Sequence, residues 1–419
     1  MNKMFLVGHI RRGWLLAALC IFILSSACFV RADDVIEISK STELGTPPTP
    51  IAIVGFTGEV ASVLKFDLSV MGFLPVAEGS ANYVLSGSNE GVVHGMLSLV
   101  GDPSKFRAGD VISATAGRTV KFNKEYRGGS LRVQAHVLAD DVVLSITGVN
   151  GIAEKNGRIA QIAFKGEAGS GSEIFVSDFD GHNPGAATQD HSIVAAPCWD
   201  YGHFALFYTS YKLGSLHLFF QDLSSGERRV VADYPGMIGS PAVSPDGRKV
   251  AIVLAKSGAP NIYVVDADGT GLRQLTFTKE DNSSPCWSPD GQWICFASKV
   301  NERRALSKVS VNGGPLQTIN TSGFPSPSEP DWSPDGKWIA FTSQTSGFNI
   351  CVVPAAGGPA TELVAGEDPS WAPNSRTLVF VRRNRGTSTL SLLDVPTKQV
   401  KDVPRVSGTA SNSQPSWAR

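Results

Sequence analysis

A proline-x-tryptophan motif repeats along most of the sequence. Successive copies stand 39 to 46 residues apart, and the second copy has valine in place of tryptophan. A period of about 44 residues filled with short strands is typical of β-propellers, in which each blade is a four-stranded sheet. Helical repeats of this length would place apolar residues every three or four positions, and these segments do not. The copies are Pro197–Trp199, Pro241–Val243, Pro285–Trp287, Pro330–Trp332, Pro369–Trp371 and Pro415–Trp417.

Turn motifs and apolar runs within each repeat support the same fold. Ser-Pro-Asp-Gly occurs at 244–247, 288–291 and 333–336, where proline presets φ and glycine relaxes the steric demand of the turn. An apolar run follows each turn, as in Val250–Leu254 and Trp338–Thr342. Such runs predict strands that are covered on both faces. The 43 glycines and 25 prolines of the 419-residue chain agree with many tight turns.

The two ends of the repeat array predict a closed ring of six blades. Residues 159–164 and 173–177 match the second and third strands of a blade, but no Pro-x-Trp precedes them. The last motif, Pro415–Trp417, has no blade after it. Both facts are explained if the final strand completes the first blade, which also removes exposed sheet edges. We therefore expect residues 151–419 to form a six-bladed β-propeller with the motif tryptophans packed between blades.

Residues 33–150 lack the repeat and predict a small α/β domain in front of the propeller, so that the fold class is mainly β. Apolar positions 131, 135, 138, 142 and 146 have helical spacing, and Gly148 ends the pattern. On this helix His136 lies four residues before Asp140, and we interpret the two as an exposed pair and not as a catalytic dyad. The other expected elements are a helix at 60–71, strands at 51–56, 83–88, 92–100 and 120–126, and a linker near 150–156.

An export signal is expected at residues 1–32. Basic residues precede an apolar run at 14–24 that is too short to span the hydrocarbon core of a bilayer. Small residues follow, and we expect cleavage near Ala32. An uncleaved anchor and a lipid-modified Cys28 are the alternatives. The remaining cysteines do not form a disulfide scaffold, and we interpret them as core thiols: Cys198, Cys286, Cys295 and Cys351.

Composition and motifs favour a protein without catalytic chemistry. The formal net charge is −1, so no basic surface for nucleic acid is expected. The sequence has no Gly-x-Ser-x-Gly elbow, no phosphate-binding loop and no histidines at metal-ligand spacing. Asp178-Phe-Asp180-Gly181 lacks the rest of a calcium-binding loop and is interpreted as a turn. We therefore expect no enzyme activity and assign no catalytic, cofactor-binding or metal-binding residue.

The chain resembles the TolB family, periplasmic β-propeller proteins of the Tol–Pal system in Gram-negative envelopes. The specific part of the resemblance is the series of residues at the junction between the two expected domains. The resemblance covers essentially the whole chain after residue 32, and it implies a scaffold that acts in outer-membrane integrity and in constriction at cell division. The junction residues are Leu131-Arg-x-x-Ala-His136, Asp141, Thr147-Gly148, Gly151 and Arg158-Ile159-Ala160.

This resemblance also implies two sets of partner-binding residues. In the family, a mobile N-terminal segment docks on the inner-membrane protein TolA, and propeller loops dock on the peptidoglycan-associated lipoprotein Pal. Accordingly, we expect a periplasmic monomer that reaches membranes only through a TolA-like and a Pal-like partner. The N-terminal set is Asp33, Asp34, Val35, Ile36, Glu37 and Ile38. The propeller set is Met237, Ser240, Ser283 and Ser284, with Met237 standing where the family usually has histidine.

Two alternatives remain open from the sequence. A secreted propeller hydrolase, either lactonase-like or associated with a peptidase, would need acidic or histidine side chains that converge with a metal in the central funnel. A TolB-like paralogue could serve another envelope system. The small number of histidines, seven in the whole chain, argues against the hydrolase.

Overall fold

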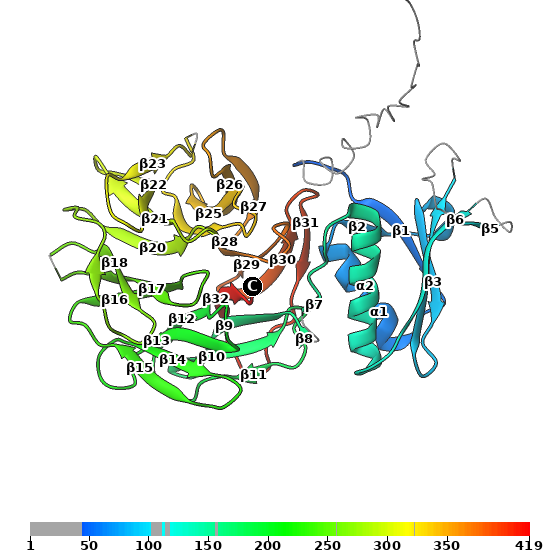
Figure 1. Cartoon of the computed structure of the whole chain (residues 1–419), viewed down its shortest axis with the longest axis horizontal. Helices are drawn as coiled ribbons and strands as arrows, with labels where there is room; N and C mark the ends of the chain where they lie inside the picture. Colours follow the sequence, from blue (N-terminus) through cyan, green and yellow to red (C-terminus); the bar gives the residue numbers. More distant parts are fainter. Residues whose placement is uncertain (1–43, 102–110, 114–117, 156–157, 257, 322) are drawn as a thin grey trace, which may run out of the picture. The chain divides into compact units, whose positions relative to one another are not determined.

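A six-stranded mixed sheet with two helices on one face forms the first part of the described chain (Figure 1). The computed structural model describes residues 44–101, 111–113, 118–155, 158–256, 258–321 and 323–419. The strand order is β2-β1-β3-β4-β6-β5, in which β1 runs parallel to β2 and β3 and the other pairs are antiparallel. The strands are β1 (Thr49–Val54), β2 (Phe73–Pro75), β3 (Tyr83–Ser88), β4 (Val93–Val100), β5 (Val111–Ser113) and β6 (Arg118–Tyr126).

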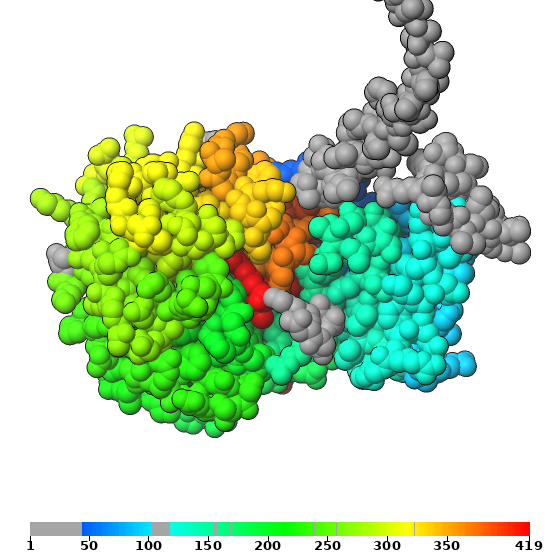
Figure 2. Space-filling model, in the orientation of Figure 1, coloured from blue at the N-terminus to red at the C-terminus, as the bar shows by residue number. Residues whose placement is uncertain are grey.

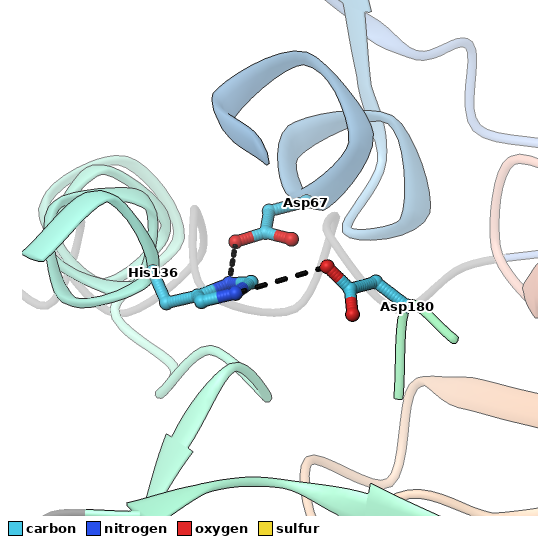
Figure 3. A group of neighbouring side chains, drawn as sticks. All are labelled: Asp67, His136 and Asp180. Atoms are coloured by element: carbon cyan, nitrogen blue, oxygen red, sulfur yellow. Dashed lines mark hydrogen bonds and ion pairs between the residues drawn. The ribbon is translucent and has the colours of Figure 1, made fainter. Parts of the chain in front are cut away.

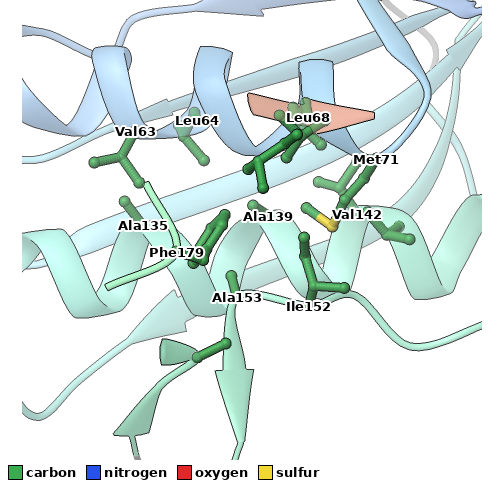
Figure 4. Packing of buried hydrophobic residues seen from close by; sticks show 14 of the residues in the cluster. Val63, Leu64, Leu68, Met71, Ala135, Ala139, Val142, Ile152, Ala153 and Phe179 are labelled. Carbon is green, nitrogen blue, oxygen red and sulfur yellow. The ribbon is translucent and has the colours of Figure 1, made fainter. Parts of the chain in front are cut away.

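The helices are α1 (Gly58–Val70) and α2 (Leu131–Thr147), and a 3₁₀ turn, η3, covers Glu78–Ser80. The Ser130 side chain caps α2 by accepting the Val133 N–H, and Gly148 ends the helix in a left-handed conformation. Val63, Leu64 and Leu68 of α1 pack against Ala135, Ala139 and Val142 of α2 in one apolar core (Figure 4). Both predicted helices are therefore present. Neither one offers, within the described ranges, an apolar stretch long enough to cross a bilayer.

Six four-stranded antiparallel sheets follow, one for each blade (Figure 1). The first blade contains β9 (Gln161–Ala168), β10 (Gly171–Asp178) and β11 (Gly185–Ala186); the second contains β12 (Val194–Trp199), β13 (Ala205–Ser210), β14 (His217–Asp222) and β15 (Arg228–Ala232); the third contains β16 (Met237–Val243), β17 (Lys249–Leu254), β18 (Asn261–Asp266) and β19 (Arg273–Gln274). The fourth contains β20 (Asn282–Trp287), β21 (Trp293–Val300), β22 (Arg303–Ser310) and β23 (Gln317–Ile319); the fifth contains β24 (Ser328–Trp332), β25 (Trp338–Gln344), β26 (Phe348–Pro354) and β27 (Thr361–Ala365); the sixth contains β28 (Glu367–Trp371), β29 (Thr377–Asn384), β30 (Thr387–Asp394) and β31 (Gln399–Asp402).

The last strand, β32 (Asn412–Trp417), closes the ring by pairing with β9 of the first blade. Asn412 lies opposite Gly166 and Trp417 lies opposite Ile162. In Figure 2 the C-terminal residues, in red, reach the surface between the green and the orange blades. The predicted fold class, a mainly β chain with a small α/β region followed by a closed six-bladed propeller, is confirmed.

The five motif tryptophans are buried in the apolar clusters that join neighbouring blades. The indole N–H of Trp287 donates to the carbonyl of Ala242 in the preceding blade at 2.8 Å, and that of Trp199 donates to Ser416 at 3.0 Å. Burial of a large ring with its N–H satisfied explains tryptophan at positions 199, 287, 332 and 371. The indole nitrogen of Trp417 is buried without a hydrogen-bond partner among the described residues, so burial alone accounts for that ring. The four described cysteines are free thiols, as expected, and three of them are buried.

The expected linker near residues 150–156 contains structure that the sequence did not predict. A short hairpin of β7 (Glu154–Lys155) and β8 (Arg158–Ile159) stands there, and Ile159 belongs to it and not to the first blade. The described residues from 44 to 419 belong to one compact unit. A domain boundary at residue 150 therefore stays a prediction.

Candidate functional site

The six motif prolines line the propeller channel, which contains a cavity of about 380 Å³. The residue before each proline has a left-handed backbone, with φ between 51° and 55°. Each innermost strand also has a register shift at this point, which is a β-bulge that redirects the chain. One repeated backbone feature thus presents six residues to the channel wall. These residues are Ala196, Ser240, Ser284, Glu329, Asp368 and Gln414.

Two of these residues, Glu329 and Asp368, bring carboxyl groups from adjacent blades together. Glu329 Oε2 accepts the Thr342 hydroxyl at 2.7 Å and the backbone N–H of Asp368 at 3.1 Å. Burial raises the pKa of Asp368 well above its usual range, and the charges of Glu329 and Glu367 raise it further. Asp368 therefore keeps its proton to a higher pH than an exposed aspartate would. Among the described residues that line this cavity there is no histidine.

The structure separates the predicted propeller residues into three environments. Ser240 and Ser284 line the channel cavity. Ser283 lies beside it in a second groove, of about 930 Å³. Met237, at the start of β16, packs instead against the apolar cluster between the second and third blades. The N-terminal residues 33–38 lie outside the described part of the chain, and partner binding by either set stays a prediction.

The groove at Ser283 has basic residues on one wall. It is bordered by the start of β20, the β21–β22 hairpin and the loop before β24. Lys299 on the hairpin pairs with Glu302 at 2.8 Å. Arg303 and Arg304 also line the groove and are exposed, and within the described ranges neither forms an ion pair. These two guanidinium groups are thus available to carboxylates of another molecule.

A second candidate site is the buried ionic cluster of Asp67, His136 and Asp180 (Figure 3). The interpretation of His136 as part of an exposed pair with Asp140 is wrong, because its side chain is fully buried. His136 Nδ1 lies 2.6 Å from Asp67 Oδ2 on α1, and its Nε2 lies 3.8 Å from Asp180 Oδ2, which follows β10. The helical stripe of α2 points inward at this position, since Ala135 and Ala139 beside it are also buried.

Arg132 extends this cluster by one turn of α2. Its side chain is buried and forms an ion pair with Asp180, and its Nη1 lies 3.2 Å from Glu59 at the start of α1. Residues Asp178–Gly181 do form the predicted turn, with the Gly181 N–H donating to the Asp178 carbonyl. The turn also places the Asp180 carboxylate beside Arg132 and His136 of α2. This contact between the turn and the helix was not predicted from the sequence.

The pKa values in this cluster are shifted by burial and by mutual attraction. Burial raises the pKa of Asp67 to about 6, although His136 opposes the shift. For His136, burial lowers the pKa, but the charge and the hydrogen bond of Asp67, together with the charge of Asp180, outweigh burial and raise it above 6.5. The charged form of the imidazole is thus favoured more than it is in an exposed histidine.

One sequence signal could have revealed the cluster. Apolar residues of α1 recur at Val60, Val63, Leu64 and Leu68, and Asp67 occupies a position on that same buried stripe. A carboxylate on the core face of a helix requires a partner, because burying an unpaired charge is costly. Its partners come from segments far away in the sequence, so the signal indicates a buried pair without identifying the other member.

The fold described above is that of a six-bladed β-propeller protein with an α/β region in front of the ring. The sequence profile described as the TolB β-propeller domain matches residues 144–419. The chain therefore belongs to the TolB β-propeller domain family.

Curated relatives and solved structures agree with this membership. The Tol-Pal system protein TolB of Francisella tularensis is 28% identical over 277 residues, or 63% of each chain. That of Bordetella pertussis is 31% identical over 265 residues, which are 62% of this chain and 59% of the relative. The alignments thus span less than two thirds of the length of these relatives. The crystal structure of TolB from Acinetobacter baumannii has a TM-score of 0.75 at 20% identity, covers 90% of this chain and 98% of that chain, and has the same fold.

Proposed function

We propose that this protein is a non-catalytic scaffold of a Tol–Pal envelope system. The observation that carries the proposal is membership in the TolB propeller family over residues 144–419. Two curated relatives are named as Tol-Pal system proteins. The described lining of the channel holds the six motif prolines and the carboxyl pair of Glu329 and Asp368 but no imidazole, so it lacks a histidine that could act as the general base of a hydrolase, which favours a scaffold.

The propeller face around Ser283 is the proposed site for a Pal-like lipoprotein. This face collects the loops that enter the innermost strands and the hairpins between the second and third strands of each blade. It offers a groove of about 930 Å³ next to the channel and two guanidinium groups, those of Arg303 and Arg304, that form no ion pair with any described residue. Interfaces of this kind combine a concave surface with arginine side chains at the contact. We expect the partner to present carboxylates to Arg303 and Arg304.

The N-terminal segment is the proposed site for a TolA-like inner-membrane protein. Residues 33–46 are polar, with apolar residues at Val35, Ile36 and Ile38 that could add as a strand to the edge of a partner's sheet. Both partners place the protein in the periplasm after removal of residues 1–32. Through them it would connect the inner and outer membranes at the site of cell constriction.

A substitution at the groove tests the propeller site. Ser283→Arg places a long charged side chain in the groove and should weaken binding of a purified Pal-like peptidoglycan-binding domain at least about tenfold, by surface plasmon resonance. Ser224→Arg is the matched control, because Ser224 is exposed and follows β14 at the opposite end of its blade. Unchanged affinity of the Ser283 variant would reject this face as the docking site.

A deletion tests the N-terminal site. A chain that begins at residue 47 should lose capture of a TolA-like domain and keep capture of the Pal-like domain. Loss of both, with normal thermal unfolding, would contradict separate binding sites.

A further inference from the structure

The Asp67–His136–Asp180 cluster joins three separate parts of the chain in one buried place (Figure 3). Asp67 comes from α1, His136 from α2 and Asp180 from the turn after β10 in the first blade. All three side chains are at most 5% exposed. The imidazole lies between the two carboxylates and thus connects both helices to the turn of the first blade.

The number of protons on the imidazole ring decides whether His136 can donate an N–H to both carboxylates. Nδ1 lies 2.6 Å from Asp67 Oδ2, and Nε2 lies 3.8 Å from Asp180 Oδ2 with no hydrogen-bond partner in the described part of the structure. A neutral imidazole has one N–H, so it can donate to only one carboxylate and must turn a lone pair toward the other. Only the imidazolium presents an N–H to both.

The charge balance of the cluster also favours a protonated His136. With His136 protonated, the two carboxylates of Asp67 and Asp180 are matched by the imidazolium and by the guanidinium of Arg132, which pairs with Asp180. With His136 neutral, one negative charge is left uncompensated in a buried site, which is strongly unfavourable. The other titratable or charged groups that face the cluster are Glu59 from α1, and Asp178 and His182 from the turn of the first blade.

A metal ion is a poorer occupant of the same place. Each of the three side chains offers one atom within 4.8 Å of the others. The Arg132 guanidinium, however, already pairs with the Asp180 oxygen that faces His136. A divalent cation would have to displace this guanidinium or lie beside it, and two like charges at this distance repel strongly in a buried site. A proton on His136 needs no such displacement.

Phe179 connects the His136 ring to aromatic side chains outside the ionic cluster. Its ring stands edge-on to His136 at 5.5 Å and lies 6.1 Å from Phe66 of α1. The Phe179 ring also stacks, at 6.3 Å between centroids, on Trp417 of the closing strand. Trp417 in turn lines the channel. The helices, the first blade and the closing strand therefore share one aromatic seam, defined by Phe66, His136, Phe179 and Trp417.

We propose that His136 carries a structural proton that latches the two helices to the first blade, and that loss of this proton at alkaline pH loosens the seam. This inference does not depend on the proposed function, because it rests on contacts within the chain. The ion pairs of the latch are complete where Asp67 is ionised and His136 is still protonated, and the latch opens at higher pH, where Asp67 and Asp180 are left facing a neutral ring.

The direct test is the titration of His136 in the chain without residues 1–32. Nitrogen chemical shifts of ¹⁵N-histidine-labelled protein report the charge of each ring, and His136→Gln assigns the signal. The expected midpoint lies above the ordinary value of 6.5, and Asp180→Asn should lower it. His203 is the matched control, because it lies 3.0 Å from Asp200 but is exposed, and Asp180→Asn should leave it unchanged. A His136 ring that is already neutral at pH 6.5 would overturn the proposal.

Two further measurements use the same protein. Amide hydrogen-exchange protection of α2, corrected for intrinsic rates, should fall several-fold as pH rises through the His136 midpoint; constant protection would contradict the latch. Thermal unfolding with equimolar Zn²⁺ should match unfolding with EDTA. A zinc-dependent rise in the wild type that is lost in His136→Gln would show a metal in place of the proton and would equally overturn the proposal.

Discussion

Buried ionisable residues of this protein stand beside opposite charge in most places where they occur. Asp190 is buried and binds Arg228 through two contacts of 2.5 and 2.7 Å. Although burial opposes it, the hydrogen bonds of Arg228 and Ser210 lower the pKa of Asp190. Asp368 in the channel departs from this rule, because burial and the neighbouring charges of Glu329 and Glu367 raise its pKa well above its usual range, so that it holds its proton to a higher pH. Charge is thus neutralised either by a partner or by a proton.

The pH dependence of stability follows from Asp67 and His136. Both groups bind protons more tightly in the folded state, since the pKa of Asp67 is raised to about 6 and that of His136 is raised above 6.5. When the folded state binds more protons than the unfolded state, the free energy of unfolding falls as pH rises. Stability from Asp67 is therefore lost between pH 3.8 and about 6, and stability from His136 is lost above pH 6.5.

Urea unfolding at about pH 6 and about pH 8.5 measures the second of these changes. The wild type should lose more unfolding free energy between the two values than His136→Gln does, because the variant has no titrating group at this position. A variant with the same pH dependence as the wild type would show that His136 does not contribute.

Single residues were predicted well where the reason for them is local. The motif tryptophans and the Ser-Pro-Asp-Gly turns could be interpreted from their own neighbours. His136 was misplaced because its burial depends on Asp180, 44 positions away in the chain and in a different structural layer. Sequence spacing gives the face of a helix, but it does not say whether another part of the chain covers that face.

At the scale of elements, the Ser-Pro-Asp-Gly turn is a repeated unit with its own hydrogen bonds. In the turn at 333–336, the Ser333 hydroxyl donates to Asp335 at 2.6 Å and accepts the Trp338 N–H at 2.9 Å. Gly336 then adopts φ of 76°. The turn sets the start of the following buried strand, β25, and the same geometry recurs at Ser244 and Ser288.

Alanine at two glycines separates backbone strain from other effects. Gly336→Ala should cost about 1–2 kcal/mol of unfolding free energy, since a left-handed φ disfavours a side chain. Gly347→Ala should instead stabilise by about 0.4–1 kcal/mol, because that glycine has no positive φ and a Cβ there meets nothing within 4 Å. Equal effects of the two substitutions, measured by urea unfolding, would contradict this assignment.

Element prediction succeeded for long, periodic segments and failed for short ones. The strand expected at 83–88 and the helix expected at 131–146 agree with β3 and α2 to within one residue. The strands β2 and β5 have three residues each, and the β7–β8 hairpin has two residues in each strand, so none shows an alternation long enough to detect. These short strands are fixed by pairing with distant neighbours.

At the scale of the whole molecule, ring closure depends on one strand. Ser413 of β32 lies opposite Lys165 of β9, and the Gln414 side chain accepts the Ala196 N–H at 2.9 Å from 218 residues away. Without β32, the inner edge of the first blade would be left unpaired, and such edges promote aggregation.

A disulfide across the closing pair tests this arrangement. Ser413→Cys with Lys165→Cys should oxidise readily and raise the unfolding free energy by about 2–4 kcal/mol in denaturant titrations. The control, Ser413→Cys with Glu167→Cys, is two residues out of register and should oxidise poorly on non-reducing gels. Efficient oxidation of the control pair would contradict the observed register.

The closing strand also has a consequence for the order of folding. Blades two to six are each built from neighbouring strands, so their hairpins can form early from nearby residues. The first blade needs a strand from the far end of the propeller sequence, and contacts between distant residues are slow to form. We therefore expect the first blade to remain incomplete, with only β9, β10 and β11 paired, until β32 has been synthesised and pairs with β9. This pairing should be the slowest step of folding, and it is also the step that makes the propeller rigid.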